Sequence, residues 1–119
     1  MKDRVNWINK NGKKILIMDY TGLKNDEIKE VINEAIEVCK TQPLKSVLSI
    51  TDLTNTYLTK STFEMFKKMD AITSQYDLKS SVVGLNKAKK IFLNLVNMFN
   101  KSDIKGFDTR EDAIQWLTK

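Results

Sequence analysis

The stretch 46-SVLSITDLTNTYLTKSTFEMFKKM-69 decides the fold of this chain. Val47 to Thr51 predicts a buried strand, Asp52 opens a polar turn, and a helix is expected to start near Thr59. In an open α/β domain, ligands and partners usually bind at the loop after the carboxyl end of a parallel strand. This edge of the sheet is therefore where a functional site is expected.

Side chains alternate along the predicted strand. Leu48 and Ile50 point to one face of the sheet, while Val47, Ser49 and Thr51 point to the other. One face is thus apolar and the other is half polar. We expect helices to cover one side of the sheet well and the second side thinly, unlike a fully doubly wound sheet.

The segments on both sides of this stretch continue an alternation of strands and helices. Asn11-Gly12 between two extended runs predicts a hairpin. Apolar positions with a period of 3.6 predict helices after caps at Asn25, Thr59 and Asn86, and a short last helix follows a cap at Thr109. The predicted strands are 5–9, 14–20, 47–51, 80–85 and 104–107.

This order of elements predicts one α/β domain that covers residues 1–119. Right-handed crossovers make the strands from the second onward mostly parallel, with the first antiparallel at an edge. The expected architecture is a mixed, mainly parallel sheet of four to five strands with about four helices, mostly on one face.

Composition narrows the class of protein. Apolar residues make up 41% of the 119 residues and charged residues 29%, which is ordinary for a soluble globular domain. No apolar run approaches the roughly 20 residues that a membrane span needs, and the first residues have no signal-peptide core. The net charge of +5 comes without the aromatic-interleaved basic motifs of nucleic-acid binders. We expect a cytoplasmic protein with no membrane insertion and no nucleic-acid partner.

The residues exclude the commonest catalytic chemistries. The chain has no histidine, which removes Ser-His and Cys-His catalysis and the commonest metal ligand. Cys39 is the only cysteine, and its spacing places it on the apolar face of a helix as a buried, inert thiol. We therefore expect no enzyme activity, no catalytic residue, no metal site and no cofactor.

With these elements in place, the chain resembles the STAS superfamily (sulfate transporter and anti-sigma-factor antagonist domains). More narrowly, it is similar to small stand-alone bacterial proteins described as anti-sigma-factor-antagonist-like. The resemblance rests on VLSITDLTNTYLTKSTFEMFKKM, on VVGLNKAKKIFLNLVNMFN and on the ending IKGFDTREDAIQWL, and it covers nearly the whole chain. It implies a STAS-like fold and a regulatory or protein-interaction role.

One motif of the signalling branch of that superfamily is missing. Antagonists carry an Asp-Ser-Ser-Gly-like segment at the start of the second helix, where a partner kinase phosphorylates a serine. Here Tyr57-Leu58-Thr59-Lys60 stands at that place, so Thr59 is the only aliphatic hydroxyl there that could take the place of the serine. A helix cap explains Thr59 without any modification.

Three lysines in the first turn of the third helix form a candidate anion site. Lys87, Lys89 and Lys90 lie where the positive end of the helix dipole disfavours cations, and Gly84 and Asn86 precede them. A bound phosphate, carboxylate or acidic partner would relieve this mismatch. The alternative is a solvated basic turn.

Asp19, Asp52 and Asp108 each follow a predicted strand, so they could share one edge and hold Mg²⁺ or accept phosphate. The paired acids and the Lys-Pro of response-regulator receivers are absent. Turn formation is the simpler interpretation of Asp52 and Asp108.

The predicted function is a non-enzymatic STAS-like interaction or regulatory module. Binding would use Asp52, Thr59 and the turn from Gly84 to Lys90, with a protein partner, self-association or a small anion as its target. The alternative is a small carrier of an apolar or anionic molecule, because the distantly related CRAL-TRIO lipid-transfer domains share a similar sheet and the two middle helices could enclose a pocket.

Overall fold

The computed structural model describes residues 3–119. In chain order the elements are β1 (Val5–Lys10), β2 (Lys13–Asp19), α1 (Asn25–Lys40), β3 (Val47–Asp52), α2 (Lys60–Thr73), β4 (Asp77–Val83), α3 (Lys87–Asn100), β5 (Lys105–Phe107) and α4 (Arg110–Leu117). The predicted alternation of strands and helices is confirmed.

The five strands form one sheet in the order β1-β2-β3-β4-β5. β1 pairs antiparallel with β2, and the three other pairs are parallel. β3, which begins the stretch predicted to decide the fold, therefore lies in the middle of the sheet. The predicted mixed, mainly parallel sheet with an antiparallel first strand at its edge is confirmed.

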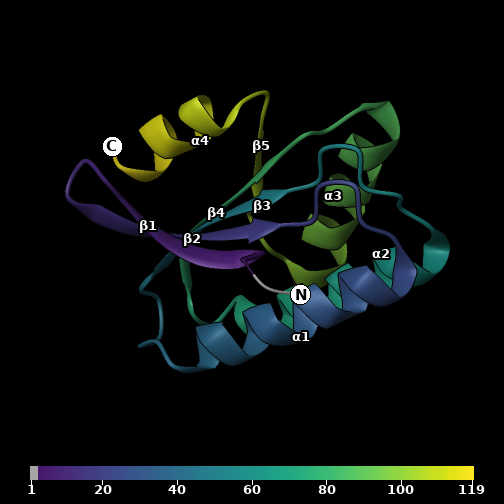
Figure 1. Ribbon diagram of the computed structural model, residues 1–119, viewed down its shortest axis with the longest axis horizontal. Helices are drawn as coiled ribbons and strands as arrows, with labels where there is room; N and C mark the ends of the chain where they lie inside the picture. The colour runs from purple at the N-terminus through teal and green to yellow at the C-terminus, as the bar shows by residue number, and fades with distance from the viewer. Residues whose placement is uncertain (1–2) are drawn as a thin grey trace.

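Helices cover the two faces of the sheet unequally. α1, α2 and α3 lie on one side, and α4 lies alone on the other (Figure 1). Leu48 and Ile50, on the apolar face of β3, pack in the cluster that contains Ala113 and Leu117 of α4. The half-polar face of β3 is therefore the one that lies under three helices, and this determines what is buried beneath them.

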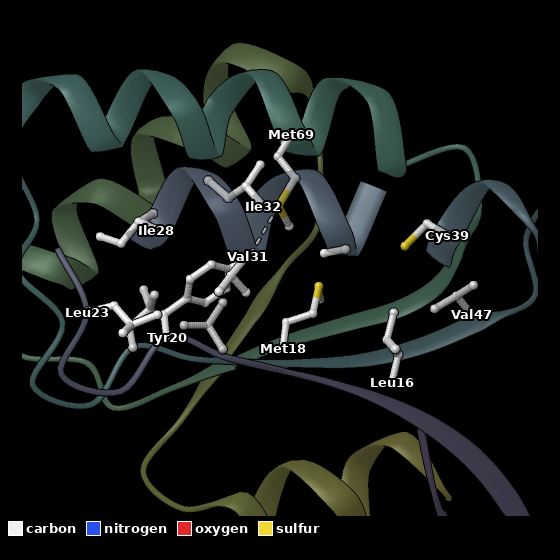
Figure 2. Close-up of a cluster of buried hydrophobic side chains, with 13 residues drawn as sticks. Leu16, Met18, Tyr20, Leu23, Ile28, Val31, Ile32, Cys39, Val47 and Met69 are labelled. Carbon is white, nitrogen blue, oxygen red and sulfur yellow. Dashed lines mark hydrogen bonds between the residues drawn. The ribbon is translucent and has the colours of Figure 1, made fainter. Parts of the chain in front are cut away.

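The larger core lies between α1 and the sheet. Met18 of β2 and Tyr20, which directly follows that strand, meet Ile28 and Val31 of α1 there, and all four are nearly or fully inaccessible to solvent (Figure 2). Burying each such side chain stabilises the fold by roughly 1.5–3 kcal/mol. The phenol of Tyr20 donates to the Met69 sulfur of α2 at 3.5 Å, which ties a second helix to the same core.

The predicted helix starts are confirmed at three of four positions. The side chains of Thr59, Asn86 and Thr109 each accept a hydrogen bond from the backbone N–H of the residue three positions further along the chain, as N-caps do. The predicted cap at Asn25 is wrong. Lys24 is the cap residue, without a side-chain cap bond, because it is held extended by a bridge to Tyr57.

The fourth strand also differs from its predicted range of 80–85. It runs from Asp77 to Val83, because Asp77 and Lys79 already pair with β3, and Gly84 ends it with φ at +80°. Asp77 is thereby half-buried, at the amino end of a strand.

Candidate functional site

A buried carboxylate anchors the carboxyl edge of the sheet. Asp52 accepts hydrogen bonds from the Thr54 amide at 3.0 Å, the Thr54 hydroxyl at 2.6 Å and Nε of Arg110 at 2.9 Å. Burial acts to raise the pKa of Asp52, but the bonds from Thr54 and Arg110 outweigh it and hold that pKa below its usual value. Asp52 is therefore a fixed anion that joins α4 to β3.

The neighbouring strand adds a second carboxylate to this network. Asp19 lies 3.6 Å from Arg110 and 3.7 Å from Arg4, and it accepts a hydrogen bond from the Thr21 amide. The two carboxylates and two guanidinium groups satisfy one another. Within residues 3–119, no group of three or more acidic, histidine or cysteine side chains is arranged to hold a metal ion.

The next loop closes tightly over this network. Gly84 packs directly against the backbone of Thr54. Asn86 caps α3 by accepting from the Lys89 amide, and the Lys89 ammonium donates to the Leu53 carbonyl at 2.6 Å. Burial lowers the pKa of Lys89, and the nearby Asp52 opposes that shift. Lys89 thus holds α3 against the end of β3 and points inward.

The structure brings most of the predicted site residues to one edge. Asp52, Gly84, Asn86 and Lys89 lie in the network described above. Lys87 and Lys90 are exposed on the first turn of α3, so they are the two lysines of the set that solvent reaches.

Thr59 begins α2 near this edge, where the Tyr57 amide bonds to the Leu23 carbonyl. Its hydroxyl accepts from the Thr62 amide, and its own amide donates to the Thr62 hydroxyl. Thr59 therefore has a complete capping role, while its phosphorylation and the anion site at Lys87 and Lys90 remain predictions.

A partly open cavity of about 80 Å³ lies between the half-polar face of the sheet and helices α2 and α3. Its volume corresponds to about two to three water molecules. Most of the wall is apolar and includes Phe63 and Phe66 of α2 and Phe92 and Val96 of α3. Met18 and Met69, which also line it, extend toward each other from β2 and α2 in Figure 2.

Polar side chains gather on the sheet side of the same cavity. Ser49 and Thr51 of β3, Ser80 of β4 and Thr73 of α2 line it. Ligand sites in proteins combine a largely apolar wall with a few placed polar groups, and this cavity has that composition.

Two carboxylates close one end of the cavity. Asp70 is buried, and its Oδ2 accepts from the side-chain amide (Nδ2) of Asn100 at 3.0 Å and from the Ser102 hydroxyl at 2.5 Å. Burial raises the pKa of Asp77 to about 6; a hydrogen bond from Ser80 opposes the shift and the charge of Asp70 adds to it. Of the two carboxyl groups at this end of the cavity, Asp77 is the one whose ionised form is destabilised by burial.

Replacing Asp77 with asparagine should therefore stabilise the protein above pH 7 by about 1–3 kcal/mol. A raised pKa means that the native state binds its proton more tightly than the unfolded chain does. The carboxyl group thus favours folding below about pH 4, and that contribution is lost as pH rises through about 6. Urea unfolding at pH 4 and pH 8 measures the effect; an equal difference between variant and wild type at both pH values would contradict it.

The sequence predicted, as its alternative, a pocket enclosed by the two middle helices, which are α2 and α3, but it did not predict the carboxylates at the end of this cavity. The acidic candidates that the sequence suggested lie after the carboxyl ends of strands, whereas Asp77 begins a strand and Asp70 lies on a helix. A signal was present, because Ser49 and Thr51 made one face of the central strand half polar. Polar residues facing a three-helix layer indicate an incompletely packed interior.

The buried reactive groups are poor nucleophiles. Burial raises the pKa of the Cys39 thiol to about 11, and the charge of Asp77 adds to the shift. Burial likewise raises the pKa of the Tyr20 phenol far above its usual value. Both groups stay protonated at neutral pH, so neither supplies an anionic nucleophile to the cavity.

Among residues 3–119, no helix is both long and apolar enough to cross a membrane.

Comparison with known proteins identifies the fold. The chain matches no protein-family model and no curated protein. Among solved structures it is similar to an uncharacterised protein of the DUF3478 family from Shewanella loihica PV-4, described as having a SpoIIAA-like fold. The TM-score is 0.75 at 14% identity, and the match covers 95% of this chain and 91% of that chain. The likeness confirms the predicted STAS-like fold.

Proposed function

We propose that this STAS-like domain is a non-enzymatic binding module that holds a small, largely apolar molecule between its sheet and helices α2 and α3. The observation that supports this function is the cavity of about 80 Å³, with its apolar wall and its polar residues from β3 and β4. Of the two functions predicted from sequence, the small-molecule carrier is the one that this cavity supports.

The carboxyl edge supports a docking role less well. Its central groups, Asp52, Arg110 and Lys89, bond to one another or to the backbone and leave little charge to recognise a partner. These bonds better explain the edge as a structural contact, because the bond from Lys89 to the Leu53 carbonyl fixes the amino end of α3 over the cavity.

Native mass spectrometry of the protein purified from its own cells tests the proposal. We expect a bound molecule of low mass that is released on unfolding. A protein recovered only in its unliganded mass, and unable to take up any small molecule offered afterwards, would contradict the proposal.

Filling the cavity should abolish binding. Val96→Phe places a phenyl ring in the space, whereas Ile91→Phe adds the same ring on the exposed side of the same helix. We expect the first variant to lose at least about tenfold in affinity for a small apolar probe and the second to keep it. Isothermal titration calorimetry measures both. Equal binding by the two variants would place the ligand elsewhere.

A second candidate function, protein interaction, has one observation in its favour. Ile91, Met98 and Phe99 expose 59%, 70% and 63% of their surface on α3, which contains lysines and no acidic residue. Exposed apolar side chains in a basic helix suit a partner with an acidic, apolar-faced surface. Binding of such a partner should be lost in Phe99→Ser and weakened by salt; binding that survives both changes would exclude this face.

A further inference from the structure

The cavity ends at the floor of an open groove on the surface. Asp70, Asp77, Ser80 and Ile104 line both the cavity and the groove, which has a volume of about 550 Å³. These four residues therefore form a neck between the interior and the solvent. The neck lies at the amino end of β4, away from the edge that holds Asp52.

The neck carries negative charge. The hydrogen bonds from Asn100 and Ser102 keep the Asp70 carboxylate in place. Asp77 faces Asp70 and the Cys39 thiol, and Lys45 is the cation whose charge acts on it.

Three lysines, Lys45, Lys79 and Lys101, line the groove outside the neck. Lys79, on the groove side, donates to the Trp116 carbonyl at 2.9 Å and lies 5.0 Å from the Trp116 ring centre. Lys89 also lines the cavity, but it lies at the edge that holds Asp52, away from the neck, and donates to the Leu53 carbonyl. A carboxylate placed at the neck would face two like charges, whereas a cation would be attracted to both.

We propose that the ligand is a short alkylamine, with its apolar chain in the cavity and its ammonium group at Asp77. This inference rests on the proposed function and adds the class and the orientation of the ligand. The ammonium would add a hydrogen-bonded cation at Asp77, on which the charge of Lys45 already acts, and such charge-assisted hydrogen bonds are among the stronger ones. A cavity of about 80 Å³ limits the buried chain to roughly three or four heavy atoms.

Calorimetric titration at pH 8 with three probes of equal length tests the inference: propylamine, 1-propanol and propionate. We expect propylamine to bind at least about tenfold more tightly than propionate, with 1-propanol in between. Asp77→Asn should lose about tenfold in propylamine affinity and keep its affinity for 1-propanol. Asp103→Asn is the matched control, because this exposed residue lines the same groove outside the cavity.

Lowering the pH tests the same contact without a substitution. Because the pKa of Asp77 is about 6, roughly one molecule in ten keeps it ionised at pH 5. Propylamine affinity should fall about tenfold between pH 8 and pH 5, while 1-propanol affinity should not change. Asp77→Asn should remove the pH effect if Asp77 causes it. The other titratable groups around the neck and its groove are Asp70, Cys39, Lys45, Lys79, Lys101 and Asp103.

Xenon distinguishes the failure of this inference from the failure of the proposed function. If propionate binds as well as propylamine, or if Asp77→Asn leaves propylamine binding unchanged, the ligand class is wrong. Binding of xenon or 1-propanol would then still support an apolar site. If neither the three probes nor xenon under pressure binds, the cavity holds water alone and both proposals are overturned.

Discussion

Gly84→Ala is expected to destabilise the protein by about 3–5 kcal/mol, one of the two largest effects of any single substitution considered. A Cβ atom at this position would overlap the amide nitrogen and the hydroxyl of Thr54. Gly84 also has φ at +80°, a conformation that side chains other than glycine rarely adopt. Because the obstacle is largely backbone, the loop that joins β4 to α3 has to move as a whole.

Gly12→Ala is the matched control for the steric part of this effect. Gly12 has nearly the same φ, +76°, but no atom lies within 4 Å of the Cβ that would be added. Gly12→Ala should lower the free energy of unfolding only by the cost of placing alanine in this left-handed conformation, about 1–2 kcal/mol. Urea denaturation of both variants measures the difference, and equal losses would mean that the close approach to Thr54 contributes nothing.

Asp52→Ala is expected to destabilise the protein by about 2–3 kcal/mol at pH 7. The substitution removes the acceptor of three hydrogen bonds, leaves the Thr54 amide without its partner and frees Arg110 from its shortest ion pair. Arg110 is 40% exposed, so water takes up part of the loss, and the estimate lies below that for a fully buried pair.

The pH dependence of this variant has a definite sign. A pKa held below its usual value means that the ionised Asp52 stabilises the native state above about pH 4, and that this contribution is lost as pH falls through the native pKa. The difference between wild type and Asp52→Ala should therefore shrink in acid. Asp108→Ala, at an exposed position, should change stability by less than about 0.5 kcal/mol at either pH. A constant difference for Asp52→Ala from pH 7 to pH 2 would contradict the assignment.

The fold was predictable where the sequence carries local signals. The period of 3.6 and the cap residues Thr59, Asn86 and Thr109 located three helix starts, and the alternation along 47–51 predicted a buried strand with one half-polar face. Asn25 shows the limit of such signals. A cap residue was present, but the bridge between Lys24 and Tyr57, 33 positions apart in sequence, decided where the helix begins.

The site was less predictable because its geometry is not local. Lysines in the first turn of α3 suggested an anion site, yet Lys89 turns inward to a carbonyl on another element. Asp70 and Asp77 carried no motif, and only the packing of α2 and α3 over the half-polar strand face makes them the end of a cavity. A cavity depends on how several elements pack together, and the spacing of residues in one element does not encode it.

Methyl NMR of the protein under xenon pressure tests the central claim most directly. Xenon enters small apolar cavities without needing a charge partner. The account predicts shifts confined to methyl groups of the cavity wall, such as those of Met18, Met69 and Val96, with the exposed Met98 unaffected. Shifts at Met98 alone, or none at any methyl group, would show that the space between the sheet and helices α2 and α3 does not bind an apolar guest.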